Sequence, residues 1–396
     1  MILLTLCAFT SLASAAPDTR FVTTPYQAVV VFKGPGTTYQ QLERLQAGVP
    51  MMIVERNSTG TWVHIQRTNG DGTIISDGWV ISGYLNFDLD FHFGEVPVNT
   101  TLPDADADSD MSQLHDLYLV PVIPTISDAM REVYRHGHDD LHNYSYVITK
   151  VGDSMTADDL YLKPMSRDDN VLRPYDYLGD AVSYFGASTA VASVAARIGM
   201  TSYTIFDPAW ADKTVCHPNE TPLDCEYRRK RPSIALIMFG VNDLKRMDDA
   251  KFDVQMRMIV DDSISHGVIP VLSTFSYDPG AALWLQSVLF NRRLVKIASD
   301  EQVPLINLWL AARSLPEYGL EVDGLHMKHW GFEYLKFDHG SDAFSGAALR
   351  NLLSIRTLDE IRNTVILTAP NSAKQATPEA ASTPQATSVV APTASS

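Results

Sequence analysis

The chain has 396 residues, enough for two or three domains, and its 45% apolar and 20% charged residues are typical of a globular protein with a sizeable core. Its net charge of −16 argues against a general nucleic-acid binder, because such a protein needs a basic surface to engage phosphates. Beyond the N-terminal segment, no stretch of the sequence is long and apolar enough to predict a transmembrane helix.

The two ends of the chain differ in composition from the rest. Residues 1–16, MILLTLCAFTSLASAA, are apolar or small and contain an A-x-A pattern at 13–15, which predicts a secretory signal peptide and a secreted or cell-surface protein. The usual positive n-region is missing, and a buried N-terminal segment is the alternative. At the other end, the Ala/Ser/Thr/Pro-rich tract 369–396 cannot bury a core and is expected to be disordered.

Cleavage of the signal peptide would leave two cysteines, Cys216 and Cys225, in the segment CHPNETPLDC. An even number of cysteines in an exported protein favours a disulfide that closes a small loop. A metal site is the weaker interpretation, because two thiolates need two further ligands and His217 stands directly beside Cys216.

Residues 22–92 contain short alternating apolar runs separated by turns, which predicts a small all-β domain. The order of these runs resembles a bacterial SH3-like domain. The resemblance implies a domain that binds a cell-wall or other extracellular ligand, and a purely structural accessory domain is the alternative. The residues that carry it are Gly34, Pro35, Gly36, Tyr39, Gly48, Val54, Trp62, Gly78, Trp79, Val80, Tyr84 and Leu85.

The segment 93–115 includes the acidic run DADADSD and is predicted to be a solvated acidic linker. Aspartates at alternate positions also suggest a calcium-binding loop. An EF-hand loop that began at Asp104 would need glycine at its sixth position and glutamate at its twelfth, where this chain has Ser109 and His115. We therefore favour the linker.

From 116 to 366 the pattern changes to apolar runs that alternate with longer helical segments. Fully apolar strands alternating with helices predict an α/β domain with a parallel sheet covered on both faces, and such sheets carry their chemistry at the carboxyl ends of the strands. The predicted strands are 145–151, 233–239, 267–275 and 303–308, and the predicted helices include 249–265, 281–300 and 341–361.

Three polar clusters in this domain have the residue types of a serine hydrolase. The strand at 145–151 ends in Gly-Asp-Ser with Ser154, the strand at 233–239 is followed by Gly-Val-Asn-Asp with Asn242, and Asp-Gly-Leu-His with Asp323 and His326 comes late. A serine hydroxyl needs a base to become a good nucleophile, and histidine titrates near neutral pH. An aspartate three residues before that histidine can orient its ring.

In this order the three clusters resemble the SGNH (GDSL-type) hydrolase family. The resemblance implies a flavodoxin-like three-layer α/β/α fold and ester hydrolysis without a metal or organic cofactor. It implies Ser154 as nucleophile, His326 as base and Asp323 as the residue that orients it, with an oxyanion hole formed by the Ser154 N–H, the Asn242 amide and a glycine N–H. Gly199, followed by small hydroxyl residues, fits that glycine better than Gly186, which remains the alternative.

These observations predict a secreted esterase whose substrates are acyl esters, with O-acyl groups on carbohydrate as a plausible class. A lipase or general esterase for small acyl esters is the second interpretation. A non-catalytic protein that binds cell-wall polysaccharide is the third, and the intact serine, asparagine, aspartate and histidine argue against it.

Overall fold

The structure is a computed structural model, and the residues described from it are 21–23, 28–46, 48–58, 60–82, 85, 91, 93–103, 115–278, 281–329, 331 and 335–369. The expected signal peptide, the acidic run at 104–110 and the C-terminal tract beyond Ala369 lie outside these residues. Within the described residues, no helix has the length and apolarity needed to cross a membrane.

The N-terminal part is a six-stranded antiparallel sheet, which confirms the predicted all-β domain. The strand order is β1-β4-β5-β6-β2-β3. Alternate residues of the strands point into a core that includes Val31, Ile53, Val63 and Ile65, all with no exposed surface. The strands are β1 (Phe21–Thr23), β2 (Val29–Phe32), β3 (Gln41–Leu45), β4 (Pro50–Arg56), β5 (Trp62–Thr68) and β6 (Ile74–Ile81).

Part of the segment predicted as linker lies against this β domain. Val96 is buried in the same core, and the backbone of Val98 pairs with Arg56 at the end of β4. The Arg56 N–H donates to the Pro97 carbonyl, and the Asn99 N–H donates to the Arg56 carbonyl. The chain therefore leaves the β domain only after these contacts.

The C-terminal part contains a parallel sheet in the order β10-β9-β8-β7, as predicted for an α/β domain. A further parallel pairing between Gly152 and Ala196 lies beside β7 on the side away from β8. All seven residues of β8 are buried, as expected for a central parallel strand. The strands are β7 (Tyr144–Gly152), β8 (Pro232–Met238), β9 (Ile269–Ser273) and β10 (Leu305–Ile306).

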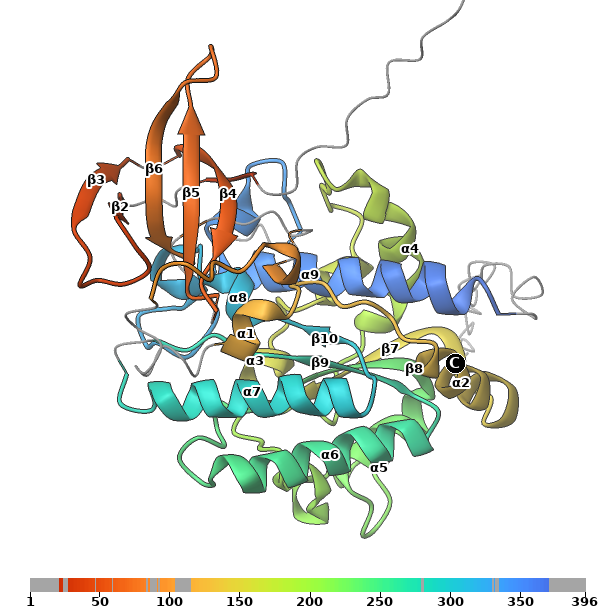
Figure 1. Cartoon of the computed structure of the whole chain (residues 1–396). Helices are drawn as coiled ribbons and strands as arrows, with labels where there is room; N and C mark the ends of the chain where they lie inside the picture. The colour runs from red at the N-terminus through yellow and green to blue at the C-terminus, as the bar shows by residue number, and fades with distance from the viewer. Residues whose placement is uncertain are drawn as a thin grey trace, which may run out of the picture.

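Helices cover both faces of this sheet (Figure 1). In the view of Figure 1, α4 (Gly179–Thr189) and α9 (Gly346–Ile361) lie above it, and α6 (Asp249–Ser265) and α7 (Trp284–Asp300) lie below. This arrangement is the expected three-layer α/β/α architecture. The remaining α-helices are α1 (His115–Leu119), α2 (Ala129–Arg135), α3 (Ser154–Ala157), α5 (Pro222–Lys230) and α8 (Leu308–Ala312).

Local sequence signals fix where several of these helices begin. The side chains of Asp248, Thr221 and Ser345 accept hydrogen bonds from backbone N–H groups in the first turns of α6, α5 and α9. Each such cap contributes about 1 kcal/mol by pairing a donor that has no partner within the helix.

A disulfide joins Cys216 to Cys225, as the sequence predicted. It connects the loop before α5 to the first half of that helix, and both cysteines are buried. The two sulfurs are bonded to each other, so the nearby Glu220 carboxylate does not form a metal site with free thiolates.

Candidate active site

Ser154 lies where strand β7 turns into the short helix α3. Asp153, between the strand and the helix, has extended backbone angles, and its side chain accepts a hydrogen bond from the Met155 N–H at 3.0 Å. The Gly-Asp-Ser turn therefore exposes Ser154 at the carboxyl end of the sheet, with Asp153 as its helix cap.

His326 and Asp323 lie on a loop that returns to this turn from far along the chain. The Ser154 hydroxyl and His326 Nε2 are 3.1 Å apart, and His326 Nδ1 is 2.6 Å from Asp323 Oδ2. If Nδ1 carries the proton and donates it to the carboxylate, Nε2 is left to accept from the serine hydroxyl. The three residues predicted as a catalytic group are thus brought together in one hydrogen-bonded chain.

The Asp323 carboxylate is held by the loop as well as by the histidine ring. Its Oδ1 accepts hydrogen bonds from the backbone N–H groups of Leu325 and His326, at 2.9 and 3.0 Å. Partial desolvation raises the pKa of Asp323, but the hydrogen bonds from His326 and Leu325 outweigh it and lower that pKa to about 2. Asp323 is therefore ionised at neutral pH and faces the ring as a fixed negative charge.

Neighbouring strand ends place Asn242 and Gly199 on either side of the serine turn. Gly152 pairs with Met238 of β8 on one side and with Ala196 on the other. Ser154 follows Gly152 by two residues, Asn242 follows Met238 by four, and Gly199 follows Ala196 by three. All three residues therefore lie beyond the carboxyl ends of adjacent parallel segments.

Gly199 and Gly186 have different surroundings. Gly199 lies in a loop with φ of +79°, a backbone conformation that favours glycine. Gly186 lies inside helix α4, where a Cβ atom would come within 2.5 Å of the Met165 carbonyl oxygen, so its role is close packing. An N–H in the interior of a helix is also committed to the helix, which favours Gly199 as an oxyanion donor.

The loops that carry Gly199 and Asn242 are bonded to each other. Asn242 Nδ2 donates to the Met200 carbonyl at 3.2 Å. Asp243 Oδ1 accepts from both the N–H and the hydroxyl of Ser202, at 3.0 and 2.8 Å. Burial raises the pKa of Asp243, while the hydrogen bonds from Ser202 oppose that change. These bonds orient the Asn242 amide, and among the described residues no acceptor takes its second N–H.

Two backbone donors at the same edge of the sheet are also available. Among the described residues, neither the Ser154 N–H nor the Gly199 N–H has a hydrogen-bond acceptor. The Ser154 N–H belongs to the first turn of α3, where N–H groups have no partner within the helix.

A buried arginine of α9 supports the serine turn. Arg350 of α9 donates to the Met155 carbonyl at 2.7 Å and to the Thr156 hydroxyl at 3.0 Å, and its guanidinium lies 3.7 Å from the centre of the Tyr161 ring. Burial lowers the pKa of Arg350. These contacts tie α3 to α9, so Arg350 positions the helix that begins with Ser154, the predicted nucleophile.

Asp153 is a second buried charge beneath the turn, with 1% of its surface exposed. Burial raises its pKa to about 6, although the Met155 N–H and the Arg350 charge oppose the change. The folded protein therefore binds this proton more tightly than the unfolded chain does. As the pH rises from about 4 to about 6, the unfolded chain releases this proton while the folded protein keeps it, which lowers the free energy of unfolding by roughly 3 kcal/mol.

We expect Asp153→Asn to remove this pH dependence, because the amide oxygen can still accept from the Met155 N–H. Urea unfolding would measure the free energy of unfolding of both proteins from pH 4 to pH 7. This free energy should decline with pH in the unchanged protein, and it should decline less in the variant. Asp261→Asn, which changes an exposed carboxylate on α6, is the matched control. Parallel curves for the protein and Asp153→Asn would contradict this account.

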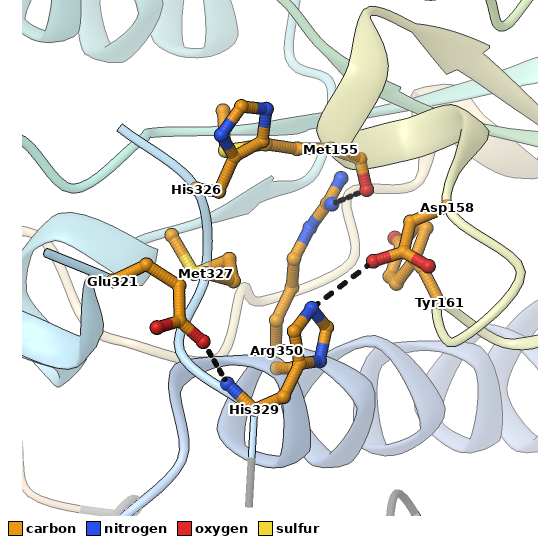
Figure 2. Close-up of a pocket in the computed structure, with 9 residues that line it drawn as sticks. Met155, Asp158, Tyr161, Glu321, His326, Met327, His329 and Arg350 are labelled. Carbon is orange, nitrogen blue, oxygen red and sulfur yellow. Dashed lines mark hydrogen bonds and ion pairs between the residues drawn. The ribbon is translucent and has the colours of Figure 1, made fainter. Parts of the chain in front are cut away.

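A second histidine, His329, links the loop that carries His326 to α3 (Figure 2). His329 Nε2 lies 3.3 Å from Asp158 Oδ2, and the His329 N–H donates to Glu321 Oε1 at 2.9 Å. The hydrogen bond to Asp158 raises the pKa of His329. With His326, Arg350 and their neighbours these groups surround a cavity of about 120 Å³, lined by Met155, Asp158, Tyr161, Glu321, His326, Met327, His329, Ala347 and Arg350.

The Asp158–His329 contact joins the end of the serine helix to the loop that carries the histidine. We expect Asp158→Asn and His329→Gln each to lower kcat/KM about tenfold, because small displacements of a catalytic group are costly. The double variant should be no slower than the slower single variant. Because the folded pKa of His329 is raised and that of Asp158 is lowered, the pair is strongest where His329 is protonated and Asp158 is ionised, and it weakens as the pH rises through the pKa of His329.

The control for this pair is Asp159→Asn. Asp159 is the next residue, and its carboxylate pairs with Lys163 on the exposed surface instead of with the loop that carries His326. Equal losses in Asp158→Asn and Asp159→Asn, or fully additive losses in the double variant, would contradict a positioning role for the Asp158–His329 pair.

Sequence reasoning did not find Asp158, Arg350 or the role of His329. Arg350 gave the clearest signal, because it interrupts the otherwise apolar and small run GAALRNLL of α9 and such a charge is buried only with partners. The Asp158–His329 contact joins residues 171 positions apart, and neither residue stands in a recognisable motif.

Solved structures of esterases and lipases are similar to the C-terminal part. One is a psychrotrophic esterase from Pseudoalteromonas sp., with 15% identity, a TM-score of 0.35, and coverage of 56% of this chain and all of that one. A lipase/acylhydrolase from Enterococcus faecalis has 21% identity, a TM-score of 0.33, and coverage of 55% and 95%. A mutant acetylxylan esterase from Geobacillus stearothermophilus has 15% identity, a TM-score of 0.34, and coverage of 55% and 95%.

A search of curated protein sequences gave no match to this chain. A family model does match the N-terminal part, namely the Bacterial SH3 domain, at residues 28–86. This range includes strands β2 to β6 of the antiparallel sheet. Residues 28–86 therefore belong to the bacterial SH3 domain family, and they precede a three-layer α/β unit with a parallel sheet.

Proposed function

We propose that this protein is a serine esterase of the SGNH type, with Ser154 as nucleophile, His326 as base and Asp323 as the residue that orients the base. The observation that carries this proposal is the hydrogen-bonded chain from the Ser154 hydroxyl through His326 to Asp323 at the carboxyl end of the parallel sheet. It is the arrangement that activates a serine at neutral pH.

The reaction has two stages. Ser154 Oγ attacks the ester carbonyl carbon while His326 Nε2 takes the hydroxyl proton, and the tetrahedral intermediate then collapses as His326 returns that proton to the departing alcohol oxygen. A water molecule, deprotonated by His326, attacks the resulting acyl-Ser154 ester in the same way and releases the carboxylic acid. The complete reaction therefore consumes only the ester and one water molecule and releases the alcohol and the carboxylic acid.

The oxyanion of each tetrahedral intermediate would be held by the N–H groups of Ser154 and Gly199 and by the side-chain amide of Asn242. Support comes from their place at three adjacent strand ends and from the bonds that fix the Asn242 loop to the Gly199 loop. Donors fixed before the reaction stabilise developing charge without reorganising.

We expect Asn242→Ala to lower kcat about 100-fold with a small change in KM, because an oxyanion donor acts mainly in the transition state. Steady-state kinetics on a chromogenic acetyl ester would measure this. Asn170→Ala, which removes an amide from an exposed loop, is the control. A rise in KM at unchanged kcat would instead assign Asn242 to ground-state binding.

The substrates we propose are short O-acyl groups on carbohydrate outside the cell. The cavity beside His326 is about 120 Å³, below the range of roughly 300–1,000 Å³ typical of pockets for larger ligands, which favours short acyl groups over lipid chains. The apolar N-terminal segment and the bacterial SH3 domain support a secreted or cell-surface location. The SH3 domain would then hold the enzyme near a wall polymer.

A panel of esters on the purified protein tests this function. We expect Ser154-dependent release of acetate from acetylated oligosaccharides and falling rates as the acyl chain of simple esters lengthens. Faster cleavage of long acyl chains would make the protein a lipase and overturn the carbohydrate assignment. Equal inactivity of the protein and Ser154→Ala on every ester would leave a polysaccharide-binding protein as the better account.

A further inference from the structure

A groove of about 740 Å³ lies at the edge of the parallel sheet, on the side of β7 away from β8. Its walls are residues 191–194, 196 and 197, which include the segment that pairs with β7, and residues 209–213 and 215 of the following loop. Arg229, in the last turn of α5, completes it. The volume lies in the range of sites that hold small organic ligands, about 300–1,000 Å³.

The groove adjoins the proposed oxyanion site. Trp210 lines it, and the edge of the Trp210 ring would lie 3.8 Å from a Cβ atom placed on Gly199. Arg197 also lines it, and the Arg197 N–H donates to the carbonyl of Gly152, two residues before Ser154. A molecule bound in the groove would therefore reach the carbonyl site from the Gly199 side.

The groove is positively charged in a protein whose net charge is −16. Arg197, Lys213 and Arg229 line it, against the single carboxylate of Asp212. Arg197 donates to the Trp210 carbonyl at 3.0 Å, and Lys213 donates to the Pro208 carbonyl. Such a local excess of positive charge attracts anions.

Arg229 is the cation most available to a ligand. It is exposed, and among the described residues its guanidinium makes no hydrogen bond or close ion pair, although its charge contributes to the lowered pKa of Asp212 in the same groove. An arginine with free donors binds carboxylates and phosphates through paired hydrogen bonds. Its neighbour Arg228 differs, because Glu220 holds that guanidinium at 2.6 Å.

Trp210 supplies a different kind of contact. Its ring is partly exposed in the groove, with the Arg197 guanidinium 5.7 Å from the ring centre. The face of an indole ring can pack against the C–H face of a sugar ring, while small neighbours such as Ala192, Ser193 and Ala209 leave room for it. An aromatic surface beside cations suits a sugar that carries an acidic group.

We propose that this groove binds an anionic carbohydrate part of the ester substrate, with a sugar ring on Trp210 and its carboxylate or phosphate on Arg229 and Lys213. The proposal rests on the esterase function proposed for Ser154 and assigns the class of alcohol that the ester carries. Acyl groups would be removed from acidic polysaccharide in preference to neutral polysaccharide.

The test compares three acetylated oligosaccharides of equal length, one neutral, one with uronate carboxylates and one with phosphate groups. We expect kcat/KM to be about tenfold higher for an anionic ester than for the neutral one. Whichever of the uronate and phosphate esters is cleaved faster shows which anion the groove prefers. Arg229→Gln should reduce this preference about fivefold. A rise in ionic strength from about 0.01 M to about 1 M should also reduce the preference for the anionic ester, because it shortens the Debye length from about 30 Å to about 3 Å.

The control is Lys251→Gln, which removes a charge from an exposed side chain on α6 and should leave the preference unchanged. Trp210→Ala should raise KM for all three oligosaccharides, and Trp210→Phe should restore part of the affinity. Equal rates on anionic and neutral esters, or an equal loss in Arg229→Gln and Lys251→Gln, would overturn the groove proposal while Ser154-dependent ester cleavage stands. Failure of the esterase function itself would appear as a chromogenic acetyl ester cleaved equally by the protein and by Ser154→Ala.

Discussion

Ser154→Ala is expected to lower kcat for a chromogenic acetyl ester by at least about 1,000-fold, while the protein remains folded. The reason is that the hydroxyl at 3.1 Å from His326 Nε2 would be the atom that forms the acyl-enzyme, and alanine has no atom to replace it. Single-turnover kinetics should also lose the burst of alcohol release that marks acyl-enzyme formation.

Ser183→Ala is the control for this substitution, because Ser183 is an exposed serine on α4. It should keep full activity. The far-UV circular dichroism and the melting temperature of Ser154→Ala should match those of the unchanged protein, since the Ser154 hydroxyl supports no described structural hydrogen bond other than that to His326. Activity above about one-tenth of the original in Ser154→Ala would place the nucleophile elsewhere.

Asp323→Asn is expected to lower kcat about 1,000-fold with little change in KM. Asparagine can turn its amide toward Nδ1, which favours the wrong ring tautomer, and it lacks the charge that stabilises the imidazolium during the reaction. The Asp323 and His326 side chains are 47% and 49% exposed, so water competes with this pair. We therefore expect a loss smaller than the roughly 10,000-fold known where such an aspartate is buried.

The control for Asp323 is Asp261→Asn, an exposed carboxylate on α6 that should be silent. Asp323→Glu should recover part of the rate, because a longer carboxylate can still carry the charge toward Nδ1. A kcat for Asp323→Asn within about threefold of the original would show that His326 works without Asp323. In that case the 2.6 Å contact between Asp323 and His326 would stabilise the loop and would have no role in catalysis.

Much of the fold could be predicted because the strands carry strong local signals. The apolar runs at 145–151 and 233–239 became β7 and β8 within a residue of the predicted ends, since turn residues bound both runs. The run at 303–308 gave only two paired residues, Leu305 and Ile306, because Asn307 caps helix α8 with its side chain. Hydropathy alone does not predict that Asn307 will cap a helix instead of extending the strand.

The helix predicted at 341–361 shows the same limit. Its long α-helical part begins at Gly346, because Ser345 accepts from the Ala348 N–H and caps it there. Residues 341–343 form a separate 3-10 turn. The helix-forming residues of this segment predicted that a helix exists. Its first residue depends on the hydroxyl of Ser345, which the sequence pattern did not single out.

The site was predictable to the extent that it lies in short motifs. Asp323 and His326 stand three residues apart, so their contact could be expected from sequence. The contact of His326 with Ser154 spans 172 positions and could be expected only from the order of the motifs. Arg350 and Asp158 make contacts that depend on how α9 and the loop that carries His326 pack on α3, and no local pattern encodes that packing.

The most direct test of the central claim is to treat the purified protein with a fluorophosphonate and locate the adduct by peptide mass spectrometry. Such a reagent reacts with a serine that a neighbouring base has activated. We predict one adduct, on Ser154, that forms in step with loss of esterase activity, is absent from Ser154→Ala and forms much more slowly in His326→Gln. An adduct on another serine, or full inactivation without an adduct on Ser154, would contradict the account.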